Sequence, residues 1–221
     1  MRGHGSHSPA RKPLRPSVAG TEQILVVALG DSITAGTPNW DPNPDVRRTI
    51  PDEALDERHQ WPFWTQRANG RLVVRNHGVN RERTDEIARR LEFVGSGVDA
   101  VVIQGGINDL VQGREPDSIA RNIRHMVVRS GALVPRVVVA DVLPWNNGYP
   151  EHDEPIRRLN ELIQALAADQ GITLLPFFAA LEDPDREGRM PGKWTNDGNH
   201  PSLEGHRRLG DLVSRVLDVT R

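Results

Sequence analysis

The stretch ILVVALGDSIT, residues Ile24 to Thr34, decides the fold class of this chain. Its first six residues form an unbroken apolar run rich in strand-favouring types, which is typical of a strand buried on both faces. Strands of this kind occur in parallel sheets that helices cover on both sides. Gly30 and the polar residues after it end the run. The stretch therefore predicts a buried strand that leads at once into a polar turn.

Four further apolar runs follow this strand, each separated from the next by a segment with helical spacing. Strands are predicted at 72–75, 100–103, 137–140 and 172–175, and helices at 61–69, 84–94, 116–129, 155–170 and 202–217. Strands that alternate with helices form a parallel sheet with right-handed crossovers. The pattern predicts an α/β fold, a three-layer α/β/α sandwich around a five-stranded parallel sheet.

Composition favours one domain and removes several classes of function. The chain has 221 residues, with 28 basic and 30 acidic side chains and no cysteine. Without cysteine there are no disulfide scaffolds and no cysteine nucleophiles. Residues 21–221 suit a single medium-sized domain. Because the basic residues within 1–20 are unaccompanied by any acid, the remainder is mildly acidic, and we expect no nucleic-acid partner.

Residues 1–20 are expected to be a disordered tail or an expression leader. Glycine, serine, histidine, proline and arginine dominate them, with neither helical nor strand periodicity. Prolines interrupt the place where a secretory signal would carry its apolar stretch. No apolar run reaches the length of about 18 residues that a transmembrane helix needs. The expected location is the cytoplasm, with no transmembrane segment.

A small cluster of glycine, asparagine and aspartate follows most of the predicted strands. The clusters lie at 30–34, 76–80, 105–109, 143–148 and 197–201. Any one of them is compatible with an ordinary turn. Because ligands bind at the carboxyl ends of parallel strands, we expect the clusters to meet in one site.

Ser32 lies where the first strand ends, so its hydroxyl is expected at the edge of the sheet. A serine needs a base to remove its proton, and His200 is the candidate, because Asp197 three residues earlier can orient the imidazole. Suitable donors for an oxyanion are the backbone N–H of Ser32, that of Gly78 and the side-chain amide of Asn108. These residues indicate a site for acyl transfer to serine.

Structural and chemical alternatives stay open at this point. Ser32 could cap a helix, Asn108 could form an Asx turn, and Asp197 with His200 could form a surface turn. The fragments at 30–31 and 198–200 could also supply ligands to a two-metal phosphoesterase, although the histidine pairs typical of such sites are missing. A non-catalytic α/β binding domain is the third class.

Four short blocks, in chain order, resemble the signature blocks of the SGNH (GDSL-type) hydrolases. They are GDSI at 30–33, NHG at 76–78, GIND at 106–109 and DGNH at 197–200, and the resemblance extends from about Ile24 to Leu217. It implies a flavodoxin-like sandwich that hydrolyses small-molecule esters or thioesters without a metal or organic cofactor. It makes Ser32 the nucleophile, His200 the base and Asp197 its orienting acid. The oxyanion hole would be Ser32, Gly78 and Asn108.

Two positions depart from familiar patterns. The second block of the family often continues as Asn-x-Gly-x-x-Gly, but position 81 is arginine, so we expect a different loop shape. Thr34 stands where a nucleophile elbow of the Gly-x-Ser-x-Gly type has its second glycine, which argues against an ordinary α/β-hydrolase.

The expected substrate cleft is formed by loops near the serine. Residues 37–58 are a long polar insertion, and we expect Trp40 to line the cleft from it. Trp145 and Tyr149 are expected to form another wall, and residues 182–194 to cover the catalytic turn, although each stretch is also compatible with a plain surface loop. Because no broad apolar lid is present, the expected substrates are short-chain, acetyl-type esters.

Overall fold

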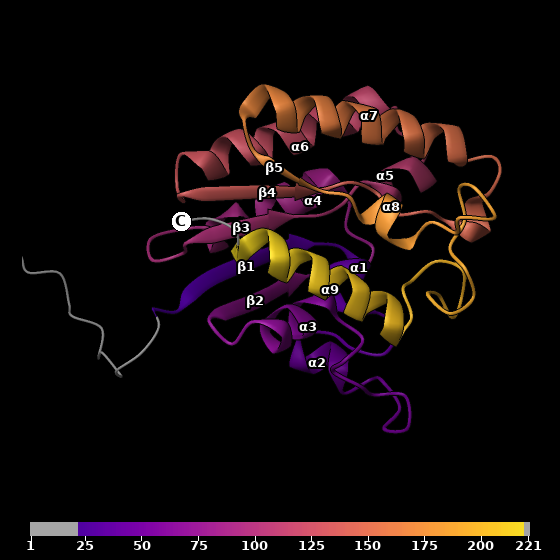
Figure 1. Ribbon diagram of the computed structural model, residues 1–221, viewed down its shortest axis with the longest axis horizontal. Coiled ribbons are helices and arrows are strands. Elements are labelled where there is room, and N and C mark those ends of the chain that lie inside the picture. Colours follow the sequence, from indigo (N-terminus) through magenta and orange to yellow (C-terminus); the bar gives the residue numbers. More distant parts are fainter. Residues whose placement is uncertain (1–21, 219–221) are drawn as a thin grey trace, which may run out of the picture.

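Five parallel strands lie between two layers of helices (Figure 1). The structure, a computed structural model, describes residues 22–218, so the predicted tail at 1–20 lies outside the described residues. The strands are β1 (Ile24–Gly30), β2 (Leu72–Gly78), β3 (Ala100–Ile103), β4 (Arg136–Ala140) and β5 (Thr173–Leu175). The longer helices are α3 (Trp61–Ala68), α6 (Pro116–Gly131), α7 (Asp153–Gln170) and α9 (Leu203–Asp218). The predicted three-layer α/β/α sandwich is confirmed.

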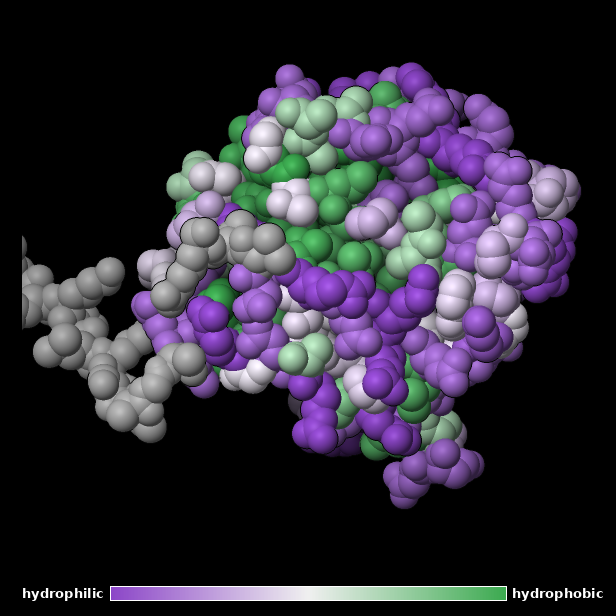
Figure 2. Space-filling model, viewed as in Figure 1, coloured by the Kyte–Doolittle hydropathy of each residue, from purple (hydrophilic) through white to green (hydrophobic). Residues whose placement is uncertain are grey.

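Successive side chains of β1 alternate between two apolar cores. Val27 and Leu29 pack with residues of α6 and α7, whereas Val26 and Ala28 pack with residues of α3 and α9. Figure 1 shows these helix pairs on opposite faces of the sheet. Figure 2 shows hydrophilic residues around most of the visible face and hydrophobic residues gathered beside α9. Burial of both faces explains why β1 is an unbroken apolar run.

The strand order β2-β1-β3-β4-β5 creates a crevice at one edge of the sheet. Connections from β1 and from β3 leave on opposite faces, so their loops separate at the carboxyl ends of the strands. The loop after β1 carries Ser32, and the loop after β3 carries Asn108. The topology alone therefore places these two residues beside the same crevice.

Short helices occupy the loops, and the sequence predicts only one of them, within the segment 84–94. They are α1 (Ser32–Ala35), α2 (Pro44–Arg47), α4 (Thr84–Arg89), α5 (Ile107–Val111) and α8 (Phe177–Leu181). The helix predicted at 84–94 ends early: α4 stops at Arg89, and a 3₁₀ turn covers Leu91–Phe93. Helices of one turn are too short to show a period of 3.6 residues. None of the helices within residues 22–218 is long and apolar enough to cross a lipid bilayer.

Candidate active site

Ser32, His200 and Asp197 form a continuous hydrogen-bonded line at the carboxyl edge of the sheet. His200 Nε2 is 3.2 Å from Ser32 Oγ, and His200 Nδ1 is 2.7 Å from Asp197 Oδ2. Ser32 is only 5% exposed, while the His200 side chain is 21% exposed. A base within reach of the hydroxyl, itself oriented by a carboxylate, is the arrangement that activates a serine as a nucleophile.

The turn into α1 holds Ser32 at the end of β1. Asp31 is the capping residue, because its Oδ1 accepts the backbone N–H of Ile33 at 2.9 Å. Ser32 is therefore the first helical residue and not the cap. Its N–H has no partner within the helix, and none of the groups in residues 22–218 accepts it. Both its hydroxyl and its N–H remain available beside His200.

Asp31, the residue before Ser32, is a buried ionisable group. It is completely buried, and its Oδ2 has no hydrogen-bond partner among the described residues. Burial raises the pKa of Asp31 to about 6, although the Ile33 N–H, Gln104 and the charge on His200 act in the opposite direction. The carboxyl therefore changes charge close to neutral pH.

Asp31→Asn is expected to change how stability depends on pH. Burial holds the folded-state pKa of Asp31 above its ordinary value, so ionisation of Asp31 disfavours the folded state, and stability falls as pH rises from about 4 to about 6. A shift of this size corresponds to about 3 kcal/mol. The free energy of unfolding of the wild type, relative to Asp31→Asn, should fall by up to that amount between about pH 4 and pH 8. Urea denaturation of both proteins at both pH values measures this difference.

The comparison with Asp31→Asn is needed because a second buried carboxyl also makes the free energy of unfolding depend on pH in this range. Burial raises the pKa of Asp141 to about 7, but Asp141 is present in both proteins and its effect cancels. Parallel stability curves for the two proteins would show that Asp31 does not titrate as described.

The turn that carries Asp197 and His200 is closed by its own hydrogen bonds. Asp197 Oδ1 accepts the backbone N–H groups of Asn199, at 2.8 Å, and of His200, at 2.7 Å. Thr195 Oγ1 donates to the His200 carbonyl at 2.8 Å. Partial burial raises the pKa of Asp197, but the His200 ring and the two N–H groups outweigh it and hold the pKa below its usual value. Asp197 is thus a fixed, ionised partner for the imidazole.

The loop after β4 supports this turn through side-chain hydrogen bonds. The Trp145 indole N–H donates to the Asn199 side-chain oxygen, and Asn147 Nδ2 donates to the Asp197 carbonyl at 2.8 Å. Gly198 has φ +78°, and a Cβ there would lie 2.3 Å from Asn147 Oδ1. Trp145, predicted as a cleft wall, therefore lies against the turn that carries Asp197 and His200. Asn147, which sequence reasoning did not single out, does the same.

The other predicted cleft elements pack mainly against their own neighbours. The guanidinium of Arg189 covers the Tyr149 ring at 4.1 Å from its centroid, and Arg47 lies 4.5 Å from the centroid of the Trp40 ring. Within the predicted cover at 182–194, Met190 exchanges two hydrogen bonds with the Asn146 side chain, at 2.7 and 2.9 Å. That segment braces the β4 loop, so the structure gives it a supporting position.

Gly78 does not present a free N–H to the crevice. Its amide donates to Asn76 Oδ1 at 2.8 Å. A Cβ at this position would lie 2.1 Å from the backbone nitrogen of Ala35, so the close approach of β2 to α1 accounts for the glycine. The predicted oxyanion donor at position 78 is therefore occupied in this structure.

Arg81 offers the backbone donor that Gly78 does not. Its φ is +68°, the one positive value for a residue other than glycine among residues 22–218, and its N–H meets no acceptor in that range. Such a conformation costs about 1–2 kcal/mol for a non-glycine residue and is commonest at functional sites. Glu82 follows Arg81, and its carbonyl accepts a hydrogen bond from Asn108 Nδ2 at 2.9 Å. The second N–H of the Asn108 side-chain amide stays unused. The sequence carries a signal for Arg81, because position 81 is where the family's second block often has its second glycine.

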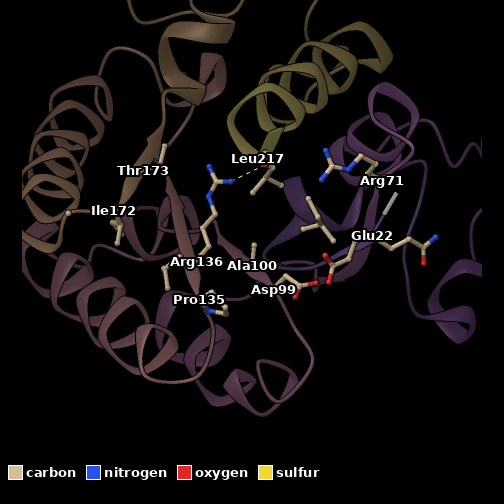
Figure 3. A pocket seen from close by; sticks show the side chains of 13 residues that line it. Glu22, Arg71, Asp99, Ala100, Pro135, Arg136, Ile172, Thr173 and Leu217 are labelled. Carbon is tan, nitrogen blue, oxygen red and sulfur yellow. Dashed lines mark hydrogen bonds between the residues drawn. The ribbon is translucent and has the colours of Figure 1, made fainter. Parts of the chain in front are cut away.

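Two further features bear on the alternatives to serine chemistry. Nowhere in residues 22–218 do three or more histidine, aspartate or glutamate side chains gather so that they could hold a metal ion. A pocket of about 590 Å³ lies at the opposite, amino-terminal edge of the sheet, between Asp99, Arg136 and Ile172 (Figure 3). None of the candidate catalytic residues lines it.

Comparisons with known proteins show which family and which relatives the chain is similar to. Residues 28–208 match the GDSL-like Lipase/Acylhydrolase family. The chain is 31% identical to the esterase TesA of Pseudomonas aeruginosa over 118 residues, 53% of this chain and 54% of that protein, so it spans about half the length of that relative. It is 27% identical to an arylesterase of Vibrio mimicus over 207 residues, which cover 89% of this chain and 88% of the arylesterase.

Solved structures share the fold at low sequence identity. A member of the lipolytic protein G-D-S-L family from Veillonella parvula superposes with a TM-score of 0.72 at 18% identity, covering 89% of this chain and 100% of that one. A lipase/acylhydrolase from Enterococcus faecalis gives 0.68 at 22% identity, covering 88% and 95%. With a family match over most of its length, the chain belongs to the GDSL-like lipase/acylhydrolase family.

Proposed function

We propose that the chain is a serine esterase that hydrolyses short-chain carboxylic esters or thioesters of small molecules through an acyl-enzyme. The observation that carries the proposal is the line from Ser32 Oγ through His200 to Asp197, with contacts of 3.2 and 2.7 Å. In this geometry the carboxylate orients the imidazole, and the imidazole can take the proton of the serine hydroxyl, which makes the serine a nucleophile. A non-catalytic binding domain would not need it.

In the proposed reaction Ser32 Oγ attacks the acyl carbonyl while His200 Nε2 takes its proton. The carbonyl oxygen becomes negative and accepts hydrogen bonds from the N–H of Ser32, the N–H of Arg81 and the free N–H of Asn108. His200 then returns the proton to the leaving alcohol or thiol, and the acyl group stays on Ser32. Water, deprotonated by His200, attacks this acyl-enzyme and releases the acid. Arg81 replaces Gly78 in the oxyanion hole expected from the sequence.

The choice of short-chain substrates rests on the loops around the serine. The insertion at 37–58 is polar and held by its own contacts, such as Asn39 Nδ2 to the Ala54 carbonyl at 2.8 Å. It offers no broad apolar surface to a lipid phase. The arylesterase of Vibrio mimicus, which matches nearly the whole chain, supports including aryl esters among the substrates tested.

Labelling with a fluorophosphonate, combined with turnover of p-nitrophenyl acetate, tests the proposal. A serine esterase should lose turnover in step with a covalent mass increase on the peptide that contains Ser32, and should keep full turnover in EDTA. Loss of turnover in EDTA would favour the two-metal phosphoesterase. No turnover across esters of varied acyl length and alcohol, and no labelling, would favour a binding domain.

Asn108→Ala is expected to lower kcat by about 10²- to 10³-fold, the usual cost of removing one oxyanion donor. KM should change little, because the donor acts mainly on charge that develops in the transition state. Steady-state kinetics on p-nitrophenyl acetate measure both constants. Asn69→Ala is a matched control, since the Asn69 amide donates to Asp218 Oδ1 at 3.0 Å, between the end of α3 and the start of β2. Equal losses in both variants would contradict the role given to Asn108.

A further inference from the structure

One arginine side chain joins the ends of two strands and the loop beside them. Arg90 Nη2 donates to the Gly30 carbonyl at 3.1 Å, and Arg90 Nη1 donates to the His77 carbonyl. Its Nε donates to Glu82 Oε2 at 2.8 Å, so the same guanidinium forms an ion pair. The side chains of Arg90 and Glu82 are only 15% and 20% exposed. At this depth, water and salt screen the pair less than they screen a surface pair.

Two partners of this guanidinium, Gly30 and Glu82, lie within two residues of a proposed oxyanion donor. Gly30 precedes Ser32 by two residues, and its carbonyl also accepts the N–H of Val79 at 3.0 Å. Glu82 follows Arg81, and its own carbonyl holds the Asn108 amide at 2.9 Å. A shift of Glu82 would therefore move two donors together. Arg90 thus connects all three donors through short covalent or hydrogen-bonded paths.

The backbone at the end of α4 lets the Arg90 side chain reach the two strand ends. The helix predicted at 84–94 is interrupted at Arg90, which has φ −96° and ψ +14°. The His77 ring stacks on Phe93, in the 3₁₀ turn that follows, with centroids 4.2 Å apart and planes 17° apart. The nearby Arg83 and Arg114 pair instead with acids such as Asp85.

We propose that the Arg90–Glu82 pair is a positioning pair that fixes the oxyanion hole. The proposal rests on the proposed esterase function. Oxyanion donors stabilise a transition state only when they are already aimed before reaction, and displacement by about 1 Å can cost about 10²-fold in rate. The pair acts on the rate through donor placement and does not itself contact the substrate.

Arg90→Met tests the pair, with Arg89→Met as its matched control. Arg89 is the adjacent arginine on α4, but its side chain is 74% exposed, and its Nη2 lies 3.8 Å from Asp85 Oδ2. Arg90→Met should lower kcat on p-nitrophenyl acetate by about 10- to 100-fold with KM within about twofold. Arg89→Met should leave both constants within about twofold. Equal kcat values for the two variants would overturn the proposal.

Glu82→Gln provides a second variant in case Arg90→Met unfolds. It keeps the shape of the side chain and the carbonyl that holds Asn108, and it removes only the charge that orients Arg90. We expect a smaller loss of kcat, about 3- to 30-fold, again with little change in KM. A folded Glu82→Gln protein with wild-type kcat would also overturn the proposal.

A double-mutant comparison shows whether the pair acts through the oxyanion hole. If it does, the loss of kcat in Arg90→Met combined with Asn108→Ala should be smaller than the product of the two single losses, since both changes remove the same stabilisation. Losses that multiply fully would mean that Arg90 acts elsewhere. Failure of the underlying esterase proposal is separate, because it appears as activity that Ser32→Ala does not abolish.

Discussion

Ser32→Ala should lower kcat for p-nitrophenyl acetate by about 10⁴- to 10⁶-fold, the largest loss expected for any single substitution in this chain. The change removes the atom 3.2 Å from His200 Nε2 that would form the acyl-enzyme. Residual turnover would come from the remaining donors and from general-base attack by water. The variant should also take up no fluorophosphonate, because no nucleophile remains to form the covalent bond.

A loss of activity carries meaning only if Ser32→Ala stays folded. Removing one hydroxyl that makes a single hydrogen bond should change the free energy of unfolding by about 1 kcal/mol or less. Ser96→Ala is the matched control, since Ser96 lies exposed in a turn away from the site. Substantial activity in a folded Ser32→Ala protein would contradict the serine mechanism, whatever the state of the other residues.

The parts of the fold that could be predicted from the sequence are those with local signals. The run at 24–29 predicts a strand because its residues are buried on both faces, which leaves no polar residue to break the pattern. The strand at 100–103 was predicted with its observed boundaries for the same reason. The Asp197–His200 contact could also be anticipated, since three residues of separation allow one turn to bring the side chains together.

The parts that could not be predicted depend on contacts between distant segments. Arg90 reaches Gly30 across 60 positions of the chain, and no spacing rule relates the two. Gly78 looked like an oxyanion donor because it is a glycine after a strand. Only the packing of β2 against α1 shows that Ala35 requires the glycine and that Asn76 takes its N–H. A residue type is compatible with several roles, and the neighbours in space decide among them.

Trp145 illustrates the same limit for side-chain direction. An aromatic residue in a loop near a serine suggests a substrate contact, and the sequence offered no reason to prefer another direction. In the structure its indole N–H finds an acceptor in Asn199, so the ring supports the turn that carries His200. We therefore expect Trp145 to affect the proposed reaction through the alignment of His200.

Asp197→Asn is expected to lower kcat by about 10³- to 10⁴-fold while the turn keeps its shape. Asp197 Oδ1 accepts two backbone N–H groups, and an asparagine can meet them only with its carbonyl oxygen. Its NH₂ group must then face His200 Nδ1, which has to accept a hydrogen bond. The imidazole proton moves to Nε2, and that nitrogen can no longer accept the proton of Ser32.

This tautomer argument makes a spectroscopic prediction that a plain loss of stability would not. The ¹⁵N chemical shifts of the His200 ring should show the proton on Nδ1 in the wild type and on Nε2 in Asp197→Asn. Asp211→Asn is the control, because Asp211 is 4.0 Å from its ion-pair partner Arg207 on the surface of α9 and should change neither kcat nor the ring shifts. Unchanged shifts together with lost activity would contradict the tautomer argument, since Asp197 would then act through its charge alone.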